Sequence, residues 1–108
     1  MELVSVAKEL HEIGREMSRE ATRLVDRGRK KAETERDYRM ALRKAIFKLR
    51  TEGIPVTIIG DLARGECADL KFERDLAETQ FTAARDLVSS LQAQLSAGQT
   101  IIKYHSEI

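Results

Sequence analysis

The feature that most constrains the fold is an apolar repeat in the first half of the chain. One heptad phase holds Leu3, Leu10, Met17, Leu24, Tyr38 and Ala45, and the companion phase three residues on holds Val6, Ile13 and Ala41. Alternating spacings of three and four residues are typical of a coiled-coil seam, whereas a strand alternates every two residues. The pattern therefore predicts a long helix over about residues 2–52.

The seam has one polar interruption. Lys31 occupies a position of the first phase, Ala32 is the only apolar side chain between Asp26 and Asp37, and Gly28 lies inside this stretch. A glycine in a helix interior costs about 1 kcal/mol relative to alanine. The helix either breaks near Gly28 or runs through as a solvent-exposed stretch, and we expect it to run through.

The residues after Leu49 predict the end of this helix. Gly53 can adopt the left-handed conformation that follows a helix, which lets Ile54 fold back on Leu49. Pro55 cannot continue the helix.

A connector is expected over residues 53–66, and it is unusually apolar because it contains Val56-Thr57-Ile58-Ile59. Within it, Asp61 is expected to cap a single helical turn. Loops normally face water, so the connector either covers the end of the core or binds a partner. The candidate partner-binding residues are Ile54, Val56, Ile58, Ile59, Leu62 and Arg64.

A second helix is predicted over about residues 67–97, followed by a short tail over 98–108 because Gly98 is expected to end or fray the helix. Residues 100–105 of the tail are expected to form either a last helical turn or a short strand. Its seam consists of Leu70, Ala77, Ala84 and Leu91, interleaved with Arg74, Phe81, Val88, Leu95 and Ile102. The stripe is wider than a two-position seam, which is enough to contact more than one neighbouring helix.

The fold class that follows is all-α, with residues 1–108 forming a single antiparallel two-helix coiled-coil hairpin. Folding the helices about the centre of the connector pairs Leu49 with Leu70, Leu42 with Ala77, Tyr38 with Phe81, and Leu24 with Leu95. A two-helix hairpin buries little surface, so a homodimer or higher homo-oligomer is expected, most simply a dimeric four-helix arrangement. The expected oligomer interface is Leu87, Val88, Leu91 and Leu95.

The charge is unevenly distributed along the chain. Residues 1–50 carry fourteen Lys and Arg against nine Asp and Glu, whereas residues 51–108 carry five against nine. The two halves can therefore attract each other or a second copy. The alternative is a nucleic-acid-binding surface, because phosphate contacts need such charge. Its candidate residues are Arg23, Arg27, Arg29, Lys30 and Lys31.

No catalytic, cofactor or metal site is predicted. The glycines fit no nucleotide-binding loop, and His11-Glu12 begins a zinc-protease motif whose second histidine position is Arg15. Cys67 is the only cysteine, so no internal disulfide is expected, and a reducing, cytoplasmic location is favoured. No apolar run approaches the roughly 20 residues that a membrane span needs. We therefore expect neither an enzyme, nor a small-molecule substrate, nor a membrane partner.

Residues 45–78, AIFKLRTEGIPVTIIGDLARGECADLKFERDLAE, resemble small helical proteins encoded by phages and prophages of Gram-positive bacteria. The shared features are a Leu-Arg-x-Glu-Gly helix end, a Pro-Val-Thr-Ile-Ile connector and Asp-Leu-Ala-Arg-Gly before an Arg-Asp-bearing helix. The resemblance implies a small phage protein that acts in the host cytoplasm, on DNA metabolism or against host defences. It assigns no role to individual residues.

The sequence therefore predicts a non-enzymatic protein that acts by protein–protein interaction. The expected partner is a component of a host defence system or of host or phage DNA metabolism. A nucleic-acid-binding accessory protein is the alternative.

Overall fold

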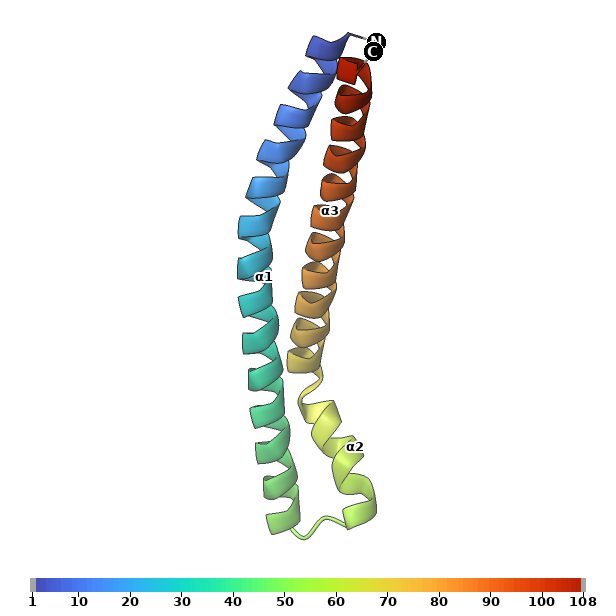
Figure 1. Ribbon diagram of the computed structural model, residues 1–108. Helices are drawn as coiled ribbons and strands as arrows, with labels where there is room; N and C mark the ends of the chain where they lie inside the picture. The colour runs from blue at the N-terminus through green and yellow to red at the C-terminus, as the bar shows by residue number, and fades with distance from the viewer. Residues whose placement is uncertain (1, 108) are drawn as a thin grey trace. The chain divides into compact units, whose positions relative to one another are not determined.

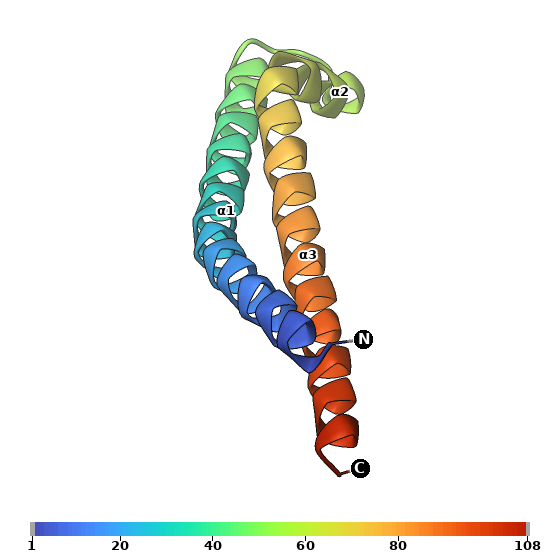
Figure 2. The same cartoon turned by 90° about the horizontal axis from the view of Figure 1, so that it is seen from above.

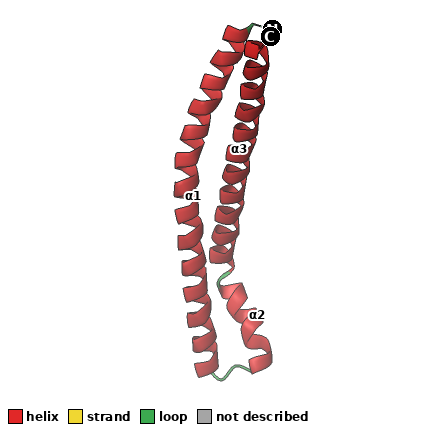
Figure 3. Ribbon diagram, viewed as in Figure 1, coloured by secondary structure: helices red, strands yellow, loops and turns green. Residues whose placement is uncertain are grey.

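The computed structural model describes residues 2–107, and none of these residues lies in a strand (Figures 1 and 3). The elements are α1 (Leu3–Thr51), α2 (Val56–Glu66) and α3 (Ala68–Glu107). The all-α prediction is confirmed. Helix α1 matches the predicted range of about 2–52 and continues without a break through Gly28, as expected.

The chain divides into two compact units, which we describe separately. Unit 1 contains Met1–Asp26 and Thr82–Ile108, and unit 2 contains Arg27–Phe81. In unit 1, the buried apolar side chains come from the predicted seams of α1 and α3, and they are Val6, Ala84 and Leu91. Glu20 is also buried on the α1 seam, and its carboxylate accepts a 2.7 Å hydrogen bond from Arg23.

The core of unit 2 joins α1 to α2. Its buried residues are Tyr38, Ala45, Leu49, Ile59, Ala63 and Cys67. Three of them lie on α1 and two on α2, while Cys67 is the single residue between α2 and α3. The only cysteine is therefore a buried, free core residue.

The end of α1 has the predicted geometry. Gly53 has a φ of 80°, its N–H donates to the Arg50 carbonyl, and the Ile54 N–H donates to the Leu49 carbonyl over 3.1 Å. These two bonds define a Schellman motif, in which the left-handed residue lets the chain satisfy the last carbonyls of the helix. Ile54 packs against the core that contains Leu49. The chain then reverses through a short connector, which Figure 2 shows from above.

The connector predicted over 53–66 contains a longer helix than the single turn that was expected from Asp61. Helix α2 begins at Val56, directly after Pro55, so Asp61 lies inside the helix instead of starting a turn. The β-branched residues of this segment have low helix propensity. Burial of Ile59 and Ala63 against α1 outweighs that preference, because tertiary packing supplies more free energy than propensity removes.

The predicted end of the second helix near Gly98 is wrong, since α3 continues to Glu107 and includes the expected tail. Gly98 is buried, and the Leu10 side chain occupies the space beside it. A Cβ atom added at Gly98 would lie 3.0 Å from Leu10 Cγ. This glycine therefore permits a close approach between two helices and does not end one.

The expected pairing of the two long helices is displaced by two to three turns in unit 2. Phe81 was expected opposite Tyr38, but it lies under the Lys31 ammonium and against Gly28, where an added Cβ would be 3.5 Å from its ring. The side chain over the Tyr38 ring is that of Arg74. The displacement arises because the chain reverses at residues 52–55, before α2, and α2 already runs back along α1.

Candidate protein-interaction surface

Helix α2 divides its apolar side chains between two faces. One face buries Ile59 and Ala63 against α1. The other face leaves Ile58 46% and Leu62 42% exposed, whereas Val56, 78% exposed in the first turn, lies on the same side of the helix as Ile59 and Ala63. Exposed apolar clusters of this kind mark interaction sites more often than isolated exposed residues do. We call Ile58 and Leu62 the α2 outer face.

The remaining predicted partner-binding residues do not belong to this surface in the same way. Ile59 was predicted as a binding residue, and this is corrected because its side chain is buried in the core of unit 2. Ile54 is half-buried against the same core. Arg64 is exposed, and its guanidinium lies over Gly60, where an added Cβ would be 3.3 Å from Nη1.

The predicted oligomer interface is only partly accessible. Leu91 is buried inside unit 1, so it cannot contact a second copy unless the unit opens. Val88 and Leu95 are half-buried, and Leu87 is the exposed member of the set. The sequence pattern did not separate these positions because all four fall on the wide apolar stripe of α3.

The predicted basic residues have different environments. The Arg23 guanidinium donates to the buried Glu20 carboxylate in unit 1. In unit 2, the Lys31 ammonium lies 5.0 Å from the centre of the Phe81 ring. Arg27, Arg29 and Lys30 are exposed, and within residues 2–107 none of them forms an ion pair. These three are the members of the basic segment that remain available to an anion.

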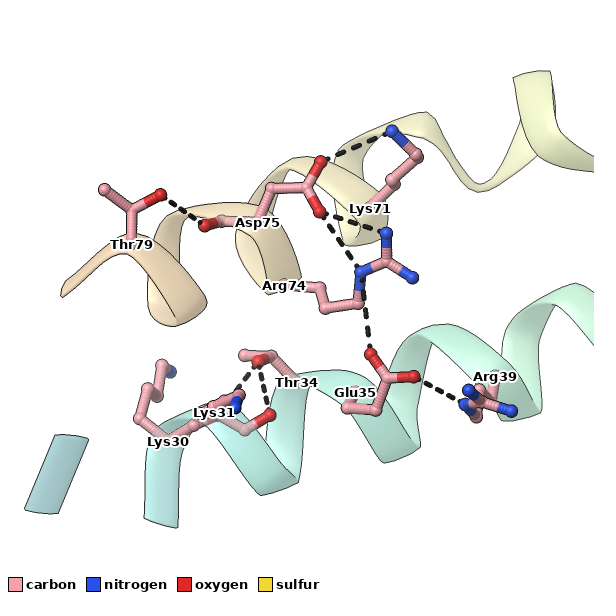
Figure 4. Close-up of polar contacts among 9 residues, drawn as sticks. All are labelled: Lys30, Lys31, Thr34, Glu35, Arg39, Lys71, Arg74, Asp75 and Thr79. Atoms are coloured by element: carbon pink, nitrogen blue, oxygen red, sulfur yellow. Dashed lines mark hydrogen bonds and ion pairs between the residues drawn. The ribbon is translucent and has the colours of Figure 1, made fainter. Parts of the chain in front are cut away.

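A polar contact between α1 and α3 centres on Arg74 in unit 2 (Figure 4). Its guanidinium lies 3.5 Å from Glu35 Oε2 on α1, 4.6 Å from the centre of the Tyr38 ring, and 3.0 Å from Asp75 Oδ1. Glu35 is also paired with Arg39. The arrangement joins α1 to α3 within unit 2.

The same contacts shift two pKa values. The hydrogen bond to Asp75 raises the pKa of Arg74 above its ordinary value, and burial opposes this effect. The hydrogen bond from Arg74 lowers the pKa of the Asp75 carboxyl, with a further contribution from Lys71, which lies 3.3 Å away. Both groups therefore stay charged over a wider pH range, as expected for a structural ion pair.

A hollow on α1 that the sequence analysis did not single out lies beside this contact. It is lined by Arg36, Arg39, Met40, Leu42, Arg43, Ile46, Phe47 and Arg50, all from α1 of unit 2. Met40 is 52% and Phe47 72% exposed, so its apolar lining faces solvent. The seven-residue spacing from Met40 to Phe47, repeated from Arg36 to Arg43 and Arg50, would have indicated it.

Within the part of the chain that the structure describes, no three His, Cys, Asp or Glu side chains are grouped as metal ligands would be. No helix of that part combines the length and the apolar character that crossing a membrane requires. Comparison of the chain with protein-family models, curated proteins and solved structures found no match.

Proposed function

We propose that this chain is a non-enzymatic interaction protein that captures a protein partner through the α2 outer face. The observation that supports this most is that α2 has two apolar faces, one that buries Ile59 and Ala63 and one on which Ile58 and Leu62 stay exposed. A helix needs only one apolar face for its own core, and a second apolar face is available to another molecule.

The architecture that we propose is an antiparallel two-helix coiled-coil hairpin. Within unit 1 the Leu10–Gly98 contact supports it, and within unit 2 the Gly28–Phe81 and Glu35–Arg74 contacts do. We further propose that the chain self-associates, either as a dimer that brings four long helices together or as a higher homo-oligomer. A pair of helices alone buries little apolar surface, so its stability is low. Association with a second copy would bury more apolar surface and raise that stability.

The partner that we propose is a component of bacterial host defence or of host or phage DNA metabolism. The interaction would take place in the host cytoplasm. This part of the proposal rests on the resemblance of residues 45–78 to phage and prophage proteins. Only a capture experiment identifies the partner itself.

The test compares tagged wild-type protein with the double variant Ile58→Asp, Leu62→Asp in a Gram-positive bacterial lysate. Both side chains are exposed, so the variant should keep its helical circular dichroism spectrum. The two Asp side chains should prevent partner binding because they place negative charge in the interface. We expect the wild type to retain a discrete protein that the variant loses. Val25→Asp, an exposed valine on α1 in unit 1, is the matched control and should retain it. Equal capture by all three proteins would reject the α2 outer face.

A nucleic-acid-binding function is the second candidate, supported by Arg27, Arg29 and Lys30, which are exposed and form no ion pair with any other residue of 2–107. Phosphate contacts would make duplex binding fall steeply with salt, and the triple substitution of these residues with Gln should lower the log–log slope by about one per lost contact. Lys103→Gln in unit 1 is the control. Absence of duplex binding at low ionic strength would eliminate this function and leave the first untouched.

A further inference from the structure

The two long segments of unit 2 carry opposite charge. Residues 27–50 hold ten Lys and Arg against three Asp and Glu, whereas residues 51–81 hold three against seven. Four of the arginines recur every seven residues along one side of α1, and they are Arg29, Arg36, Arg43 and Arg50. The surfaces that carry these charges also carry exposed large apolar side chains.

On α1, we define the α1 outer face as Met40, Arg43, Phe47 and Arg50, which line the hollow described above. Met40 and Phe47 each follow a buried core residue, Tyr38 and Ala45, by two positions. Two positions correspond to a rotation of about 200° around a helix, so both side chains point away from the core. This face therefore presents an apolar hollow with a basic rim.

On α3, we define the α3 outer face as Asp69, Phe72, Glu73 and Leu76. Phe72 is 63% exposed. It precedes Arg74 by two positions, and since the Arg74 side chain reaches α1, Phe72 points away from α1. Leu76 lies one turn further along and is also exposed. This face presents a projecting aromatic ring with acidic neighbours.

The charged side chains of both faces are not paired within the described part of the chain. Within the described range 2–107, no ion pair involves Arg43 or Arg50 on α1, or Asp69 or Glu73 on α3. Because the two faces lie on opposite sides of unit 2, a chain cannot pair them with each other. A surface that complements them would therefore belong to another molecule.

We propose that the α1 outer face of one copy of this chain binds the α3 outer face of a second copy, with Phe72 in the hollow between Met40 and Phe47. Asp69 and Glu73 would then face Arg43 and Arg50. The charge complementarity selects a second copy over an unrelated partner, because this chain itself supplies the acidic, aromatic surface that the hollow fits. The inference rests on the self-association proposed above and assigns its surface.

This pairing is heterologous, since each copy uses one face of each kind. Two copies joined in this way leave an α1 outer face free at one end and an α3 outer face free at the other. Such contacts add further copies, or close a ring, but they do not stop at a two-fold dimer. The number of chains in the assembly therefore distinguishes the two possibilities: a closed dimer through the leucines of α3 stops at two chains, whereas this pairing does not.

The test uses two full-length variants, Phe47→Asp and Phe72→Asp, measured by light scattering and sedimentation over increasing concentration. The wild type should grow beyond two chains, and each variant alone should associate about tenfold or more weakly, as expected for a central aromatic anchor. An equimolar mixture should form a heterodimer and stop there. Each variant keeps the one face that the other lacks, and the two altered faces no longer offer an aromatic anchor and an apolar hollow to each other.

Two control variants distinguish loss of the assigned surface from a general effect of placing Asp at an exposed apolar position. Tyr104→Asp changes an equally exposed aromatic on α3 in unit 1 and should assemble as the wild type does. Ile58→Asp, Leu62→Asp should also assemble normally, because the α2 outer face serves the other proposal. A wild type that stays monomeric would overturn the inference and the self-association, but not partner capture by α2. Assembly that is unchanged in Phe47→Asp or Phe72→Asp would overturn the assigned surface alone.

Discussion

Two helical glycines of unit 1 show how far the effect of one residue depends on its neighbour. Nothing lies within 4 Å of a Cβ added at Gly14, whereas a Cβ at Gly98 meets the Leu10 side chain. Gly14→Ala should therefore stabilise the protein by up to about 1 kcal/mol through helix propensity. Gly98→Ala should be less stable than Gly14→Ala by about 1–3 kcal/mol, because overpacking opposes the same gain.

Thermal or urea unfolding of both variants measures this difference. A double variant that combines Gly98→Ala with Leu10→Ala should recover part of the cost of Gly98→Ala, because the shortened side chain vacates the space. Equal stability of the two single variants would show that Leu10 does not pack on Gly98.

The Asp75 carboxyl makes one contribution to stability depend on pH. Its pKa is lowered in the folded state, mainly by the hydrogen bond from Arg74, so between the folded and unfolded pKa values the unfolded chain binds more protons. Its contribution is therefore present above the ordinary value of 3.8 and is lost as the pH falls through the lower folded pKa.

The melting temperatures of the wild type and Asp75→Asn should accordingly differ at pH 7 and converge at a pH below the folded pKa. Asp86→Asn, another exposed aspartate of α3, is the control and should show a smaller change in the difference. A difference that is constant with pH would contradict the assigned cause.

At the scale of elements, the reversal between α1 and α2 depends on Gly53. Its φ of 80° is strained for any residue with a Cβ, at a cost of about 1–2 kcal/mol. Gly53→Ala should therefore lower the free energy of unfolding by about this amount. Gly65→Ala in α2, where nothing lies within 4 Å of the added Cβ, should be neutral or slightly stabilising. Urea titration distinguishes the two, and equal effects would mean that the Schellman turn does not fix the reversal.

At the scale of the whole molecule, self-association should couple to unfolding. A species that binds only the folded state raises the melting temperature as its concentration rises. The wild-type melting temperature should increase with protein concentration, whereas that of Phe72→Asp should stay nearly constant. Differential scanning calorimetry over a hundredfold concentration range checks this. A concentration-independent wild type would argue against assembly of the folded chain.

Several features could be predicted because they depend on local sequence. The seven-residue repeat of apolar residues predicted α1, and it could not have produced a strand because the spacing is wrong for one. The end of α1 was equally readable, since Gly53, Ile54 and Pro55 act on the backbone within two or three residues. Val56 and Ile58, two of the candidate partner-binding residues, are exposed.

Other features depended on contacts between segments distant in sequence. The helical state of 56–66 follows from burial of Ile59 against α1, which no local propensity indicates. The same burial removed Ile59 from the candidate site, as burial in unit 1 removed Leu91. The hollow around Phe47 was overlooked because its residues lie outside the seam.

The sequence by itself determined that the chain is helical, where α1 begins and ends, and which residues form the two seams. Periodicity and turn chemistry act over a few residues, so they can be read without coordinates. Only the tertiary structure decided the pairing of the seams in unit 2, the helical conformation of residues 56–66 and the role of Gly98 in packing against Leu10. A heptad repeat fits its partner equally well after a slip of whole turns, and packing contacts alone choose among those alternatives.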